Sequence, residues 1–322
     1  LGMAPDVRSY NAVIDAYARE KGKRRYGDEA ARAAERCEAL LDEMINSDCE
    51  PLQRGGMRPT AATYNAVLNA WSRVGDRRAA TRAETLVRQM EDAGTAMPNG
   101  ITYNTLMSAW ARSGDAAGPR RSREIFDRMG AIHAETRQTD VRPSALTYNT
   151  LINAYAVRLT KLHQRRKIDD DAETSAFDTV VDELRDLLAQ MRRPDTAAPP
   201  DRVTYNTVLR VCSQTLTRRR EGMDLAMELF EEMNAAAQGG DRRLAPDSHT
   251  YGNMLACVAN LAETEDSNVK ARDACADTIF TACMKAGRVS GIILKNLKRA
   301  VSEEEYVRLG LEWRRKQRGE RK

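Results

Sequence analysis

The sequence predicts an all-α protein, an α-solenoid (superhelix) of about six helical hairpins that ends in a helical cap. Two observations predict this fold. A Tyr-Asn pair followed by apolar residues recurs along the 322 residues, and after each copy an apolar pair stands three residues before a Met. Aromatic residues make up only 5% of the chain, which is otherwise rich in Ala, Arg, Glu and Leu. Such a composition favours helices over sheets.

The first segment of each repeat has the spacing of an amphipathic helix. In the second copy, four residues fall at positions i, i+3, i+4 and i+7 and so share one helix face: Tyr64, Val67, Leu68 and Trp71. The same stripe recurs three times, beginning at Tyr10, Tyr103 and Tyr148. We therefore expect Tyr64, Trp71, Tyr103 and Trp110 to be buried between helices.

The second segment of each repeat is also helical in spacing, and a proline follows it. The five methionines that end these segments are Met44, Met90, Met129, Met191 and Met233. The prolines are Pro59, Pro98, Pro143, Pro200 and Pro246, and a proline cannot continue the preceding helix. Two amphipathic helices cannot hide their apolar faces alone, whereas stacked hairpins can.

This order of residues resembles the pentatricopeptide repeat family over about residues 5–285. The repeated tyrosines lie 39 to 57 residues apart, which is longer than the family's repeat, and we expect the excess in loops. The resemblance predicts a repeat array over 1–288, with units at about 7–60, 61–99, 100–144, 145–201, 202–247 and 248–288. Residues 289–322 are expected to form capping helices and a basic tail. The chain begins at Leu1, close to a repeat, so we expect a longer parent protein.

The resemblance gives the Asn after each Tyr a role that the core does not need. In the family, this reading residue recognises one RNA base together with the last residue of the unit. The reading residues are Asn11, Asn65, Asn104, Asn149 and Asn206, and Gly252 departs from the pattern. The last residues are Thr60, Asn99, Ser144, Asp201 and Asp247. An amide offers one acceptor and two donors, which suits a base edge. The alternative is an Asn that only decorates or caps the helix start.

Two further sets of residues are implied to contact RNA. The second residue of each unit holds the base between neighbouring side chains, and the apolar ones are Ile101, Leu146 and Val203. The second residues that depart are Arg8, Ala62 and His249. Cations near the end of the first helix face phosphate, at Arg19, Arg73 and Arg112. The alternative for these arginines is a structural one, because a cation is favoured at any helix C-terminus.

The family's pairings imply a preference for pyrimidine-rich single-stranded RNA. The pairs Asn149–Asp201 and Asn206–Asp247 are implied to prefer uracil. The pairs Asn65–Asn99 and Asn104–Ser144 are implied to prefer pyrimidines, chiefly cytosine, and Asn11–Thr60 only weakly prefers pyrimidines. The resemblance also implies work in a mitochondrion or plastid, in RNA processing, stability or translation.

No pattern in the sequence predicts catalysis, and we expect no enzyme, cofactor, metal or small-molecule substrate. His133 stands in an H-x-E triplet with Glu135, but a deaminase also needs a P-C-x-x-C motif, and no cysteine pair in the chain is spaced C-x-x-C. The acidic run at 168–171 is expected to be a solvated loop. No stretch approaches the roughly 18 apolar residues of a membrane span, so we expect no membrane partner. Two alternatives stay open: a protein-interaction scaffold, and the RNA-binding part of a larger RNA-processing nuclease.

Overall fold

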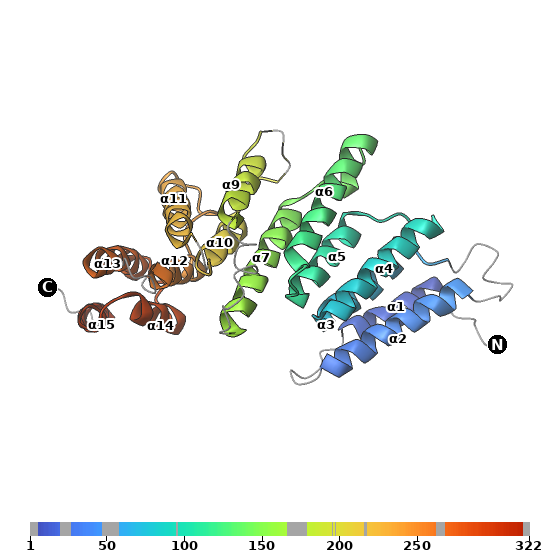
Figure 1. Cartoon of the computed structure of the whole chain (residues 1–322), viewed down its shortest axis with the longest axis horizontal. Helices are drawn as coiled ribbons and strands as arrows, with labels where there is room; N and C mark the ends of the chain where they lie inside the picture. Colours follow the sequence, from blue (N-terminus) through green and yellow to red (C-terminus); the bar gives the residue numbers. More distant parts are fainter. Residues whose placement is uncertain are drawn as a thin grey trace. The chain divides into compact units, whose positions relative to one another are not determined.

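The computed structural model describes residues 6–19, 27–46, 58–94, 96–165, 179–194, 196, 198–215, 218–261 and 268–317. Within these ranges every regular element is a helix and there is no strand. The chain forms two compact units, Leu1–Arg158 and Leu159–Lys322 (Figure 1). In both units helical hairpins stack in sequence order, so the predicted all-α solenoid is confirmed.

The first unit contains three hairpins and the first part of α7 (Ala145–Arg165). The hairpins are α1 (Val7–Arg19) with α2 (Gly27–Asn46), α3 (Ala61–Val74) with α4 (Arg77–Ala93), and α5 (Gly100–Ser113) with α6 (Gly118–Thr136). The short 3-10 helix η2 (Thr139–Val141) follows. The first helices pack side by side, α1 on α3 and α3 on α5, while α2 and α4 also pack against the next first helix.

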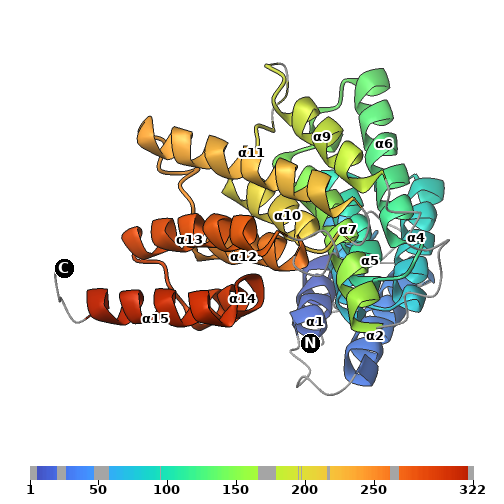
Figure 2. The ribbon, with the colours of Figure 1, turned by 60° about the vertical axis from the view of Figure 1, so that its left-hand side comes forward.

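The second unit has the same arrangement. It contains α9 (Val180–Met191), α10 (Arg202–Cys212) with α11 (Arg219–Gln238), α12 (Ser248–Leu261) with α13 (Val269–Lys285), and α14 (Gly291–Ala300) with α15 (Glu303–Gln317). The helices α10, α12 and α14 pack side by side (Figure 2). The predicted C-terminal pair is therefore a hairpin of its own.

Local signals in the sequence fix where the hairpins begin and turn. The Thr60 side chain accepts a hydrogen bond from the Thr63 N–H and so caps α3. Gly75 ends α3 with φ 78°, which a residue with a side chain rarely adopts, and Asp76 then caps α4. At the next turn, a Cβ on Gly118 would lie 2.9 Å from the Trp110 carbonyl oxygen. Only glycine lets α6 approach α5 this closely.

The repeated aromatic residues form the core, as predicted. Tyr64, Trp71, Tyr103 and Trp110 are all buried, with at most 4% of each exposed. The stripe that begins at Tyr10 is covered less completely, because Val13 remains 45% exposed. Ion pairs also join neighbouring second helices, as from Arg82 on α4 to Glu38 on α2 at 2.5 Å.

Several expectations fall on residues that the structure does not describe. The acidic run 168–171 lies outside the described residues, and so do Arg318, Arg321 and Lys322 of the basic tail. Among the described residues, no helix has the length and apolar character needed to cross a membrane. In the same part of the chain, no three His, Cys, Asp or Glu side chains gather in a way that could hold a metal.

Replacing a core tryptophan tests this packing. Trp110→Ala should lower the free energy of unfolding by about 3–5 kcal/mol, because it leaves a cavity between α5 and its neighbours. Ile101→Ala, on the same helix but 63% exposed, should change it by no more than about 0.5 kcal/mol. Urea unfolding followed by circular dichroism measures both. Similar effects of the two changes would contradict the assigned core.

Candidate nucleic-acid interface

The reading residue and the last residue of the unit meet at a hydrogen-bonded corner between α10 and α12. The Asn206 Nδ2 donates to Asp247 Oδ1 at 3.1 Å. The Thr250 hydroxyl donates to Asn206 Oδ1 at 2.8 Å. Both ends of the Asn206 amide are therefore held by residues at the start of the next first helix. We call such a set of three an amide corner: the reading Asn, the last residue of its unit, and the Thr three residues later.

Asp247 also caps the helix that follows it. Its Oδ1 accepts the Thr250 N–H at 3.0 Å and the His249 N–H at 2.9 Å. In return, the Asp247 N–H donates to the Thr250 hydroxyl at 3.0 Å, which completes a reciprocal cap. Because one carboxylate oxygen serves both the cap and Asn206, the amide of one repeat is tied to the backbone of the next.

The hydrogen bonds around Asp247 keep its carboxyl charged. Burial alone would raise the pKa of this carboxyl, but the hydrogen bonds from Thr250, Asn206 and His249 outweigh burial and leave the pKa below its ordinary value. The stability that this charge contributes is present above the pKa of the unfolded chain. It is lost as the pH falls through the lower pKa of the folded chain.

A second amide corner lies between α3 and α5. The Thr102 hydroxyl donates to Asn65 Oδ1 at 2.8 Å, and Asn65 Nδ2 donates to Asn99 Oδ1 at 3.5 Å. Asn99 Oδ1 also accepts the backbone N–H groups of Ile101 and Thr102 and so caps α5. The distance from the amide to Asn99 is longer than the distance to Asp247. This difference fits a neutral acceptor in place of a carboxylate.

Each amide corner leaves a defined part of the amide for a ligand. One N–H of the reading amide is bound by the last residue, and one lone pair of its oxygen is bound by the Thr. One N–H and one lone pair remain, which are a donor and an acceptor side by side. Such a pair matches the adjacent acceptor and donor on the edge of an unstacked base.

The other two predicted pairs of the first unit do not form these hydrogen bonds. Among the described residues, Asn11 Oδ1 and Asn104 Oδ1 are buried and accept no hydrogen bond. Their predicted partners, Thr60 and Ser144, interact instead with the Thr that follows each of them at the helix start. A hydroxyl lies one bond closer to the backbone than the Oδ1 of Asn or Asp, so it reaches less far.

The fourth predicted pair is divided between the two compact units. Asn149 lies on α7 in the first unit, whereas Asp201 belongs to the second. Asp201 caps α10 by accepting the Thr204 N–H at 2.8 Å. It therefore makes the same cap as Asp247.

Exposed apolar side chains stand three residues before three of the reading residues. Ile101, Leu146 and Val203 are 63%, 62% and 58% exposed. Residues three apart lie on the same helix face, so each of these side chains is beside the amide of Asn104, Asn149 or Asn206. Large apolar side chains left in solvent at one repeated position are more typical of a binding surface than of a core.

The three predicted cations occupy different surroundings. The Arg73 guanidinium donates to the Ala18 carbonyl oxygen near the end of α1, as a helix-capping cation does. Arg19 is exposed and lies 3.6 Å from Asp15 on its own helix, and Arg112 is exposed. The structure thus gives Arg73 a structural contact and leaves Arg19 and Arg112 facing solvent.

The threonine of the amide corner was not predicted. Five threonines precede the repeated tyrosines, and each is fully buried: Thr63, Thr102, Thr147, Thr204 and Thr250. The signal was present in the sequence, since each stands three residues after the last residue of a unit, at the spacing of a capping box. The hydrogen bond to the preceding repeat was not visible, because Thr250 lies 44 positions after Asn206.

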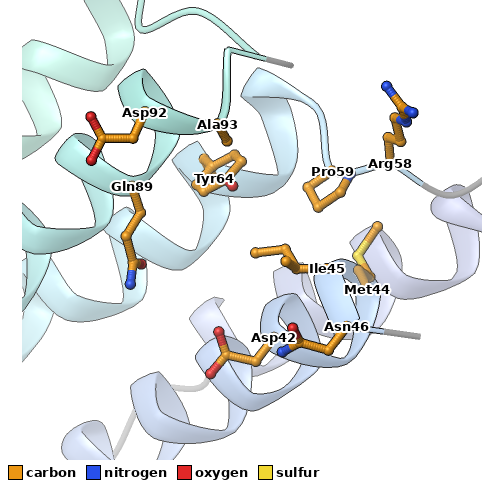
Figure 3. Close-up of a pocket in the computed structure, with 10 residues that line it drawn as sticks. All are labelled: Asp42, Met44, Ile45, Asn46, Arg58, Pro59, Tyr64, Gln89, Asp92 and Ala93. Atoms are coloured by element: carbon orange, nitrogen blue, oxygen red, sulfur yellow. The ribbon is translucent and has the colours of Figure 1, made fainter. Parts of the chain in front are cut away.

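A cavity of about 500 Å³ lies elsewhere in the first unit, between α2, α3 and α4 (Figure 3). Its walls include Tyr64, Asp42, Gln89 and Asp92, and no predicted site residue lines it. Asn46 and Arg58 border it and flank residues 47–57, which the structure does not describe. We assign no site to this cavity.

Removing the hydroxyl of Thr250 tests the amide corner. Thr250→Val keeps the side-chain shape, but the half-buried Asp247 N–H loses its acceptor and Asn206 Oδ1 loses its donor. The free energy of unfolding should fall by about 1–3 kcal/mol. The control is Thr207→Val on α10, whose exposed hydroxyl bonds only to its own helix, at the Val203 carbonyl. Urea unfolding should show a change within about 0.5 kcal/mol for the control, and equal losses would contradict the corner.

Comparisons with known proteins agree with the repeated hairpins. Residues 40–113 and 85–158 match the family model described as a pentatricopeptide repeat domain. No curated protein matches the chain. A crystal structure of the pentatricopeptide repeat protein PPR10 in complex with an 18-nt psaJ RNA element is similar, with 17% identity and a TM-score of 0.38. That alignment covers 99% of this chain and 51% of the PPR10 chain.

A crystal structure of PPR10 from maize has 18% identity and a TM-score of 0.26, over 98% of this chain and 53% of that one. The chain thus spans about half the length of the solved structures that it matches. The family match falls on α3 to α6 and the residues around them, where the repeated Tyr-Asn helices, their caps and an amide corner are found. Residues 40–158 therefore match the pentatricopeptide repeat family.

Proposed function

We propose that this protein binds single-stranded RNA and selects its sequence through the reading residues. The observation that carries the proposal is the amide corner, which fixes a half-buried amide and still leaves one donor and one acceptor. A purely structural Asn would need only the bonds that it already makes. The exposed apolar side chains beside the reading residues supply the second element of base recognition, a surface against which a base can pack.

The geometry favours a single strand over a duplex. Successive second residues, such as Ile101 and Leu146, would hold a base between them while Asn104 contacts its edge. A base can enter only if it is unstacked and its pairing edge is free. In duplex RNA both conditions fail, and the groove in which sequence is displayed is too narrow for side chains.

The last residue of each unit is proposed to set which base is preferred. The Asp247 carboxylate only accepts hydrogen bonds, so the Asn206–Asp247 pair suits uracil, whose N3–H is a donor. Asn99 can also donate, so Asn65–Asn99 suits cytosine, whose N3 is an acceptor. By the same pairings Asn149–Asp201 prefers uracil, Asn104–Ser144 prefers pyrimidines and Asn11–Thr60 does so weakly. The RNA is therefore pyrimidine-rich.

The biological role follows from the family. We propose a binding protein without catalysis of its own, acting on organellar RNA in a mitochondrion or plastid. Its bound RNA would be processed, protected or translated by other components. The rival proposal, a protein-interaction scaffold, needs no row of amides at one repeat position. The third, the RNA-binding part of a larger nuclease, keeps the same interface and differs only in what is joined to it.

Binding measured over a salt series tests the proposal. The protein should bind single-stranded pyrimidine RNA more tightly than duplex RNA. Its affinity should fall as salt rises, because Lys and Arg side chains that contact phosphates release the counterions of the RNA. Asn65→Ala should weaken binding by about 1 kcal/mol, or roughly fivefold. Asn69→Ala, an exposed amide on the same helix, is the matched control and should leave the affinity unchanged. Equal binding to single strand and duplex, or none to either, would favour the scaffold.

A further inference from the structure

The C-terminal hairpin of α14 and α15 shares the register of the repeats. The helix α14 packs beside α12 as α12 packs beside α10 (Figure 2). The Asn296 Nδ2 donates to the Gly252 carbonyl oxygen at 2.8 Å, and the Asn253 Nδ2 donates to the Asn206 carbonyl oxygen at 2.9 Å. Asn206 and Gly252 hold the same position in their repeats. Asn296 therefore corresponds to Asn253, and the residue before it, Lys295, takes the place of a reading residue.

The start of α14 gives the same register independently. Ser290 is extended, with φ −136° and ψ 169°, much as Asp201 is before α10, with φ −114° and ψ 177°. The Leu294 N–H donates to the Ser290 carbonyl at 3.0 Å, as the Tyr251 N–H does to the Asp247 carbonyl at 3.1 Å. Ser290 thus stands where the last residue of a unit stands.

This register places Ile292 at the second position, which Val203 occupies on α10. Ile292 is 71% exposed, although Ile293 beside it and Leu297 are fully buried. The core of the hairpin therefore does not need Ile292. Its exposure matches the exposure of Ile101, Leu146 and Val203, the apolar residues at the second position of earlier repeats.

We propose that α14 and α15 form a seventh repeat, which extends the RNA interface of the second unit by one position. The inference rests on the proposed function. Ile292 packs against a base, and exposed Lys295 contacts a phosphate, since an ammonium donates only and suits the RNA backbone. Gly252 offers no amide, so the sixth position adds no base reading. A Cβ at Gly252 would meet only Asn296 Nδ2, at 4.0 Å, so packing does not exclude a side chain there.

Variants of the full chain test the seventh repeat, with a labelled single-stranded RNA of mixed uridine and cytidine as the probe. Ile292→Ser should weaken binding by about fivefold, the lower range for one lost base contact. Lys295→Ala should weaken binding and make the slope of log affinity against log salt shallower by about 0.7, the value for one phosphate on a single strand. The matched controls are Val269→Ser and Lys270→Ala on α13, both exposed, which should change neither quantity.

The outcomes separate this inference from the proposed function. Suppose that the unsubstituted chain binds the RNA and that Asn206→Ala weakens binding. If the two α14 variants then behave like their α13 controls, the seventh repeat is wrong and the proposed function stands. If the unsubstituted chain binds no single-stranded RNA, both the seventh repeat and the proposed function are wrong. Because Ile292 and Lys295 are exposed, circular dichroism should show unchanged helix content in both variants.

Discussion

The hydrogen bond between a reading amide and the residue that caps the next first helix is the interaction on which the proposed interface depends. At Asp247, one carboxylate oxygen holds the start of α12 and the Asn206 amide together. The position of the amide is thus fixed by the stacking of two hairpins and not by its own helix alone. The buried hydroxyl of Thr250 completes this link, because it meets the cap on one side and the amide oxygen on the other.

This arrangement explains how repeats of unequal length can present similar groups. The repeated tyrosines lie 39 to 57 residues apart, yet α3, α5 and α12 are each set by a side-chain cap and by packing against the previous first helix. The exposed residues at the second position keep their place for the same reason, because the helix start that carries them is fixed.

Much of the fold could be predicted from the sequence, because helical spacing and burial are local properties. The stripes that contain Tyr64, Trp71 and Trp110 are buried as predicted. The amide corners depend on residues far apart in the chain, and among the described pairs that lie within one unit, those with Asn99 and Asp247 form the corner. The contact of Thr250 with Asn206 could not be predicted, because the two residues are 44 positions apart whereas Thr102 and Asn65 in the other corner are 37 apart. The repeat boundaries and the site roles of these residues remain predictions.

The exchange Asp247→Asn, scored by selection from a randomised RNA pool, tests the central claim most directly. Asn99 makes the same capping bonds in the second corner, so the variant should fold, and Asp224→Asn on the exposed face of α11 controls for the lost charge. The preference opposite the fifth repeat should move from uracil toward cytosine while the other positions stay as they are. An unchanged preference, or an equal loss of affinity at every position, would show that Asp247 serves the fold and does not read a base.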